Sequence, residues 1–139
     1  MNRGQRVIVV DTSVLIAILK RESDADDLID HLSSDADYQL SALNLYEARI
    51  VLIRADRATQ LEELDSLIAQ CGIRLAAFDQ RQCDLASAAY ARYGRGTGHP
   101  ARLNLADCAA YALATSLDAA LLYKGDDFAL TDVRPALDR

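Results

Sequence analysis

The 139-residue chain lacks tryptophan, has two prolines and six glycines, and gathers its apolar residues in short runs only. The small share of proline and glycine excludes a collagenous or Pro/Gly-rich disordered chain. No apolar run approaches the roughly 20 residues that a membrane-spanning helix needs. What remains, 51% apolar and 26% charged residues, is typical of one globular domain, which we place at residues 1–139.

Cysteine is also scarce. Cys71, Cys83 and Cys108 are odd in number and widely spaced, and no two form a CxxC pair, which argues against a disulfide framework or a zinc knuckle. The first residues, MNRGQRVIVVDTS, contain an apolar run of only four residues before Asp11, with no small-residue cleavage site after it. We therefore expect a cytoplasmic protein with reduced cysteines.

Positive charge is in deficit, with a net charge of −6. Seven of the acidic residues, however, lie within residues 22–37, and the rest of the chain has 14 acidic against 15 basic residues. Thirteen of those bases are arginine, which suits bidentate contacts with phosphate. The net charge therefore does not exclude a nucleic-acid substrate, and the acidic run itself is explained most simply as a solvated helix face.

Short apolar runs alternate with longer helical patterns. We expect strands at 7–10, 38–42, 73–78 and 120–123, and helices at 12–20, 25–32, 44–55, 58–71, 79–93 and 104–117. Strands that alternate with helices predict right-handed crossovers and a mostly parallel sheet. The predicted fold class is α/β, a three-layer sandwich with a central sheet of four to five strands and helices on both faces.

Carboxylates follow two of the predicted strands. Asp11 comes directly after the first strand, and Asp126 and Asp127 lie just beyond the last. Sheets of this kind bind ligands at the carboxyl ends of their strands. Each acid also has a local explanation, since Asp11 suits a helix N-cap and Gly-Asp suits a turn.

Two further acids, Glu47 and Asp107, lie on helix faces that are otherwise apolar. Helical spacing puts Leu43, Ile50 and Val51 beside Glu47, and Leu103, Ala110, Tyr111 and Ala114 beside Asp107. A salt bridge to Arg49 is the alternative for Glu47, but residues two apart on a helix point in different directions.

A shared cation explains these acids together. Carboxylates that approach one another repel, and they take up protons unless a cation neutralises them. Hard oxygen ligands point to Mg²⁺ or Mn²⁺ rather than zinc. Such an ion lowers the pKa of a bound water, orients a phosphate and offsets charge on the leaving oxygen. The pattern therefore favours hydrolysis of phosphodiester bonds by water activated at a carboxylate cluster.

Four segments, VVDTSVLIAIL, YEARIVL, HPARLNLADCAAYALA and LLYKGDDFALTDV, together resemble VapC-type toxins with the PIN-domain fold. The likeness covers almost the whole chain, and the LNxxDC and LLYKGDDFxxTD segments make it specific. It implies a PIN-like fold and a Mg²⁺-dependent endoribonuclease, with Mn²⁺ as a substitute. Such an enzyme is the toxin of a type II toxin–antitoxin pair and cleaves cellular RNA, often tRNA or rRNA.

The resemblance also implies roles for individual residues. Asp11, Glu47 and Asp107 match the three acids of the family motif, with Asp11 and Asp107 as direct metal ligands and Glu47 holding or activating metal-bound water. Asp127 is favoured as the fourth acid, with Asp126 in reserve. The hydroxyls of Thr12 and Ser13 are candidates for contact with metal-bound water or phosphate, although helix capping explains them equally well.

Partners follow from the same resemblance. It implies a homodimer and a cognate VapB-type antitoxin that docks on the first two helices. The candidate groove residues, most of which also suit the core, are Leu15, Ile16, Leu19, Leu28 and Ile29. Three arginines flank the Gly-rich loop at 94–102 and are candidates for RNA phosphate contacts or for simple surface charge: Arg92, Arg95 and Arg102.

Two other functions remain open on the residues alone. In the first, the protein is a non-catalytic α/β interaction module whose acids cap helices and pair with arginines. In the second, it is a related metal-dependent nuclease that acts on DNA. A phosphoacceptor signalling domain fits poorly, because it needs an acidic pair after the first strand and Lys124 in a different context.

Overall fold

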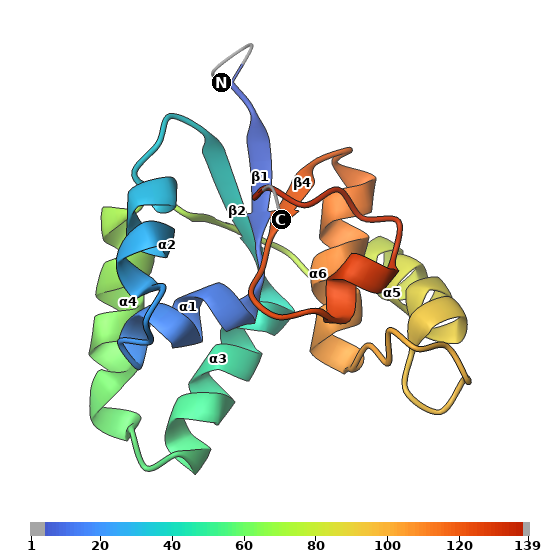
Figure 1. The fold of residues 1–139 in the computed structure, drawn as a ribbon, viewed down its shortest axis with the longest axis horizontal. Helices are drawn as coiled ribbons and strands as arrows, with labels where there is room; N and C mark the ends of the chain where they lie inside the picture. Colours follow the sequence, from blue (N-terminus) through green and yellow to red (C-terminus); the bar gives the residue numbers. More distant parts are fainter. Residues whose placement is uncertain (1–4, 138–139) are drawn as a thin grey trace.

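Four parallel strands form the central layer of the molecule (Figure 1): β1 (Val7–Val10), β2 (Asp37–Ser41), β3 (Arg74–Ala76) and β4 (Ala120–Leu122). The computed structural model describes residues 5–137. The strands pair in the order β3-β2-β1-β4, so that β1 lies between β2 and β4. The helices are α1 (Thr12–Leu19), α2 (Ala25–Leu32), α3 (Ala42–Arg54), α4 (Leu61–Gln70), α5 (Gln80–Tyr93) and α6 (Leu105–Ser116).

The helices form layers on both faces of the sheet (Figure 1). Because successive strand residues point to opposite faces, Val9 joins a core with α5 and α6, whereas Ile8 and Val10 join a core with α1 to α4. All three side chains are almost fully buried. The predicted α/β fold with a parallel sheet and helices on both faces is confirmed.

The structure differs from the expected elements in three places. The strand expected at 73–78 is confined to Arg74–Ala76. The expected helix at 58–71 is a 3-10 turn, η1 (Ala58–Gln60), followed by α4. The side-chain amide of Gln60 donates to the carbonyl oxygen of Leu19 at 3.0 Å, which gives a partner to the end of α1. A second 3-10 turn, η2 (Asp127–Leu130), follows β4 and is too short to show a helical period in the sequence.

The carboxyl ends of the strands bring distant segments together. The backbone N–H of Asp11, just after β1, donates to the carbonyl oxygen of Leu122 at the end of β4 (2.9 Å). At the end of β2, Ser41 caps α3, the helix that carries Glu47. This edge of the sheet therefore positions the candidate site. Among residues 5–137, no helix has the length and apolar character needed to cross a bilayer.

Candidate active site

Asp11 is a helix cap and a buried acid at once. Its Oδ2 accepts a hydrogen bond from the backbone N–H of Ser13 at 3.0 Å and so caps α1. Its Oδ1 is buried and has no hydrogen-bond partner among the described residues. Burial first, with a smaller contribution from the charge of Glu47, raises the pKa of Asp11 to about 6 against the opposing hydrogen bonds from Ser13. The capping role therefore accounts for only one of the two oxygens.

Glu47 lies half-buried in α3. Burial raises the pKa of its carboxyl group, and the negative charge of Asp107 adds to this, while a hydrogen bond with Thr12 acts in the opposite direction. Arg49 points elsewhere, as its spacing predicts, and pairs with Asp65 at 3.4 Å.

Asp107 is the third residue of α6 and forms a capping box with Asn104. The backbone N–H of Asp107 donates to Oδ1 of Asn104 (2.7 Å), and the backbone N–H of Asn104 donates to Oδ2 of Asp107 (2.9 Å). A helix N-terminus favours a carboxylate. Even so, burial first and the charge of Asp11 second raise the pKa of Asp107 to about 7.

Asp126 and Asp127 are exposed where η2 begins. The two differ in their effect on the pKa of Asp107, because the charge of Asp127 is among those that raise it. Asp126 is not among them and occupies the N-cap position of η2. The charge of Asp127 thus acts on Asp107.

Asp11, Glu47 and Asp107 are coupled to one another through their charges, and Asp127 is coupled to Asp107. Within residues 5–137, no three His, Cys, Asp or Glu side chains form a group spaced to hold a metal ion. The donors nevertheless fit Mg²⁺ or Mn²⁺, because they are hard carboxylate oxygens and the buried Asp11 Oδ1 has no partner in the described chain.

Comparisons with known proteins place the chain in a family. A PIN-domain family model matches residues 8–133. Ribonuclease VapC28 of Mycobacterium tuberculosis is 45% identical over 132 residues, which are 95% of this chain and 99% of that protein. The chain belongs to the VapC ribonuclease toxins of the PIN-domain family.

Other VapC proteins agree with this assignment. Ribonuclease VapC42 of Mycobacterium tuberculosis is 43% identical over 129 residues, 93% of this chain and 98% of that one. The crystal structure of Mycobacterium tuberculosis VapC20, described as a sarcin–ricin loop cleaving toxin, covers 92% of this chain and 99% of its own. That similarity has a TM-score of 0.70 at 17% identity and so shows the shared fold.

Asn44 is a buried residue of this PIN domain that sequence reasoning missed. Its Nδ2 donates to Thr12 Oγ1 and to the carbonyl oxygen of Ala106, both at 3.1 Å. Thr12 Oγ1 in turn donates to the backbone oxygen of Asn44 at 3.1 Å. Asn44 therefore joins α1, α3 and α6, the helices that begin at or carry the three coupled acids. Its one signal in the sequence is a polar residue one turn before Glu47 in an apolar helix.

The candidate hydroxyls have partners within the protein. Thr12 is bonded to Asn44, and Ser13 Oγ accepts from the backbone N–H of Lys124 at 3.0 Å. The ammonium group of Lys124 pairs with Glu22 (2.6 Å) and Asp24 (3.0 Å). Two residues of the acidic run therefore pair with Lys124 after β4. The simpler expectation was that the whole run forms a solvated helix face.

The candidate arginines occupy different surroundings. The charge of Arg95 lowers the pKa of Asp107, and its Nε donates to the backbone oxygen of Arg102 at 3.3 Å. Arg102 is exposed. The guanidinium of Arg92 lies over the ring of Tyr93, 4.6 Å from its centroid. Of the three candidate arginines, Arg95 is the one whose charge lowers the pKa of Asp107.

Proposed function

We propose that this VapC-family chain is a Mg²⁺-dependent endoribonuclease, with Mn²⁺ as a substitute, and that tRNA or rRNA is its substrate. The observation that carries the proposal is that each of three acids raises the pKa of another through its charge. Glu47 raises the pKa of Asp11, Asp107 raises that of Glu47, and Asp11 raises that of Asp107. Three acids from three segments therefore share one small region, where a cation would relieve their repulsion.

The chain's own residues divide the work. Asp11 and Asp107 would hold the cation, with Glu47 beside them and Asp127 as the fourth acid in preference to Asp126. When bound, the cation supplies a water of lowered pKa and offsets the charge of the phosphate. Glu47, whose pKa is raised by burial, is suited to hold a proton at its carboxylate.

The basic residues would position the RNA. Arg95 is suited to a phosphate near the acids because its charge already acts on Asp107. Arg92 and Arg102 extend this basic surface on both sides of the Gly-rich loop. The intramolecular bonds of Thr12 and Ser13 favour a role in positioning helices over direct contact with RNA. Because the proposed substrate is cellular RNA, we place the reaction in the cytoplasm.

A cleavage assay on matched single-stranded RNA and DNA of the same sequence tests this function. We expect Mg²⁺ to support cleavage of the RNA only, EDTA to stop it, and added Mn²⁺ to restore it. Cleavage that persists undiminished in EDTA would contradict the metal-dependent mechanism, and equal cleavage of the DNA would favour the DNA nuclease instead. Mapping the RNA ends then identifies the site that is cut.

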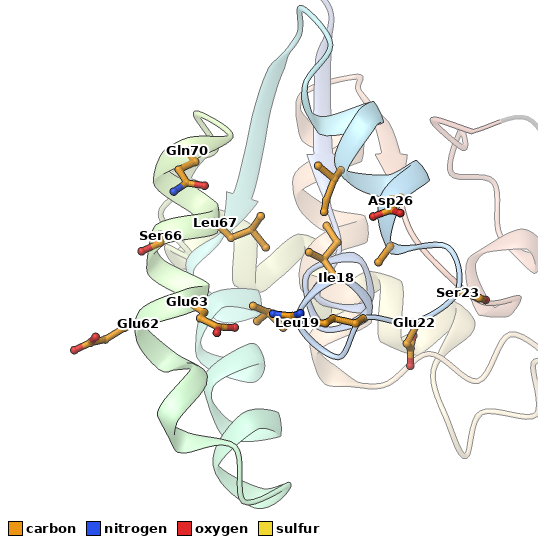
Figure 2. A pocket seen from close by; sticks show the side chains of 13 residues that line it. Ile18, Leu19, Glu22, Ser23, Asp26, Glu62, Glu63, Ser66, Leu67 and Gln70 are labelled. Carbon is orange, nitrogen blue, oxygen red and sulfur yellow. The ribbon is translucent and has the colours of Figure 1, made fainter.

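An acidic groove between α4 and the α1–α2 segment supports an antitoxin partner (Figure 2). Its volume is about 740 Å³. Apolar side chains, four acids and one arginine are among its lining residues: Ile18, Leu19, Ile29 and Leu67, with Glu22, Asp26, Glu62, Glu63 and Arg21. Of the five expected groove residues, Leu19 and Ile29 line it. Leu19 is also a core residue, as are Leu15 and Leu28, and Ile16 packs against the same core.

We infer that this groove takes an amphipathic antitoxin helix bearing Lys or Arg, since that charge complements its acids. Structures with this fold include a toxin–antitoxin complex from Klebsiella pneumoniae (TM-score 0.63, 16% identity, 88% of this chain and 90% of that one). We also infer a homodimer, because the large apolar side chains of Tyr46 and Leu105 are exposed beside the site on α3 and α6. Light scattering in solution tests the dimer through its mass.

Reversing one groove charge is expected to weaken antitoxin binding. The Glu63→Lys variant places a like charge opposite a basic helix, and we expect its Kd for the cognate antitoxin to rise about tenfold. Calorimetry with the full-length toxin measures this change. The matched control is Asp84→Lys on the exposed surface of α5, which should bind as wild type does. An equal effect of both substitutions would contradict the groove assignment.

A further inference from the structure

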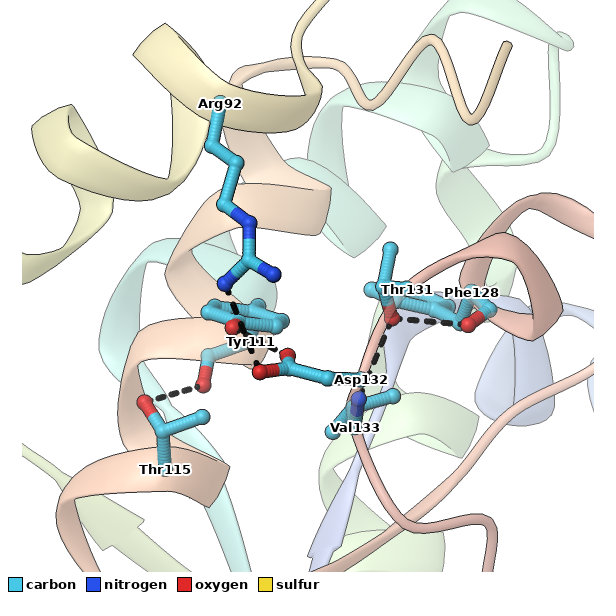
Figure 3. Close-up of polar contacts among 7 residues, drawn as sticks. All are labelled: Arg92, Tyr111, Thr115, Phe128, Thr131, Asp132 and Val133. Atoms are coloured by element: carbon cyan, nitrogen blue, oxygen red, sulfur yellow. Dashed lines mark hydrogen bonds and ion pairs between the residues drawn. The ribbon is translucent and has the colours of Figure 1, made fainter. Parts of the chain in front are cut away.

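The LLYKGDDFALTDV segment contains, just before its last residue, a pair, Thr131 and Asp132, that the proposed mechanism leaves without a role. The structure joins Asp132 to α6 (Figure 3), because the hydroxyl of Tyr111 donates to Oδ1 of Asp132 at 2.5 Å. Tyr111 lies one helical turn after Asp107, and Asp132 follows η2, which begins at Asp127. We call the Tyr111–Asp132 pair the clasp.

We propose that the clasp is a positioning device, which holds η2 against α6 so that Asp127 faces Asp107 and thereby sets the affinity of the site for a divalent cation. This inference rests on the proposed function. Asp127 is exposed and carries the same charge as Asp107, so repulsion drives the two apart. An attachment elsewhere must therefore keep η2 in place.

Hydrogen bonds within the turn after Asp127 connect η2 firmly to Asp132. The hydroxyl of Thr131 donates to the backbone oxygen of Phe128 at 2.7 Å and accepts from the backbone N–H of Val133 at 3.3 Å (Figure 3). The ring of Phe128 is buried and packs edge-on against Tyr123, with centroids 5.2 Å apart. Fixing Asp132 thus fixes the whole turn.

The bond itself has the features of a strong contact. Tyr111 is only 9% exposed, and its ring packs against Tyr93 at 5.5 Å between centroids. Asp132 is exposed, but a hydrogen bond to its carboxylate is still stronger than one between neutral groups. In agreement, the hydrogen bond from Tyr111 lowers the pKa of Asp132. Arg92 pairs with the second oxygen of Asp132 at 3.4 Å and helps to orient it.

Besides the buried ring of Phe128 within η2, two backbone anchors lie after the clasp and are independent of it. The backbone N–H of Leu121 donates to the carbonyl oxygen of Arg134 at 2.8 Å, and that of Ala136 donates to Leu121 at 2.9 Å. These bonds hold the chain after the clasp beside β4. Loss of the clasp should therefore loosen η2 without releasing the rest of the chain.

Mn²⁺ binding by the full-length protein, measured by calorimetry, tests the clasp. Tyr111→Phe keeps the buried ring and loses only the hydroxyl, and we expect it to weaken Mn²⁺ binding about tenfold, as Asp132→Ala should. Asp132→Asn keeps an acceptor oxygen for Tyr111 and should recover most of the affinity. The control is Arg134→Ala, which removes an exposed side chain paired with Asp118 and should leave Mn²⁺ binding unchanged.

The possible results distinguish a specific effect of the clasp on Mn²⁺ binding from a general loss of stability. They also distinguish failure of the clasp from failure of the proposed function. We expect cleavage by Tyr111→Phe to recover at high Mn²⁺, with the KM for RNA unchanged, and amide exchange to quicken at residues 127–133. Wild-type Mn²⁺ affinity in both folded variants, Tyr111→Phe and Asp132→Ala, would overturn the clasp and leave the proposed function standing. A wild-type protein that does not bind Mn²⁺ would overturn both.

Discussion

The Asp107→Asn variant is expected to lose RNA cleavage by on the order of 10³-fold and, at the same time, to melt at a higher temperature than wild type when metal-free. Asparagine keeps an oxygen that accepts from the backbone N–H of Asn104, so the capping box of α6 survives. It removes a charge that burial and Asp11 both disfavour. The rise in pKa from 3.8 to about 7 corresponds to about 4 kcal/mol at pH 8. If solvent screening and the burial of the new amide leave about half of this, the melting temperature should rise by about 7 °C.

Opposite changes in activity and stability distinguish a metal site from a structural acid. Cleavage of one labelled RNA and thermal unfolding in EDTA are measured on the same preparations. Asp11→Asn should behave in the same way, because its amide oxygen still accepts from Ser13. The exposed Asp84→Asn on α5 is the control and should change neither quantity. A lower melting temperature in both site variants would support the interaction module, in which the acids only cap helices.

The metal-free protein is expected to become more stable as the pH falls from 8 to 5. The pKa values of Asp11 (about 6) and Asp107 (about 7) in the folded state lie above their ordinary value of 3.8. The folded state therefore binds more protons than the unfolded state over this range, and stability is lost as the pH rises through these values. Glu47 acts in the same direction, since burial raises its pKa as well.

Urea unfolding in EDTA at several pH values measures this dependence. Burial lowers the pKa of His31 below 6.5, and this opposes the rise in stability at the acidic end of the range. The wild type is therefore compared with Asp107→Asn, which retains His31. That variant should show a shallower rise toward low pH, and saturating Mg²⁺ should stabilise the wild type most at pH 8. An identical pH dependence in wild type and Asp107→Asn would contradict the coupled site.

The candidate acids could be named from the sequence because their signals are local. Asp11 follows a buried strand, and Glu47 and Asp107 interrupt apolar helix faces, so periodicity alone singles them out. The structure adds that Asp107 lies in the first turn of α6, where the backbone N–H groups favour a carboxylate. The predicted strands and helices followed from the same local patterns.

The supports of the site were not predictable in this way, because each depends on tertiary packing. Asn44 bonds to Thr12 and Ala106, which are 32 and 62 residues away in the chain. Tyr111 and Asp132 are 21 residues apart, and neither breaks a local pattern. Periodicity marks a polar residue on an apolar face, but it does not say which distant atom will meet it.

The claim that these acids share one divalent cation is tested most directly by the electron paramagnetic resonance of Mn²⁺, whose free-ion signal falls on binding. Titration of Mn²⁺ into the metal-free protein at pH 8 should show a bound population in wild type that Asp11→Asn and Asp107→Asn each largely abolish. Equal Mn²⁺ binding by wild type and both variants would contradict the account.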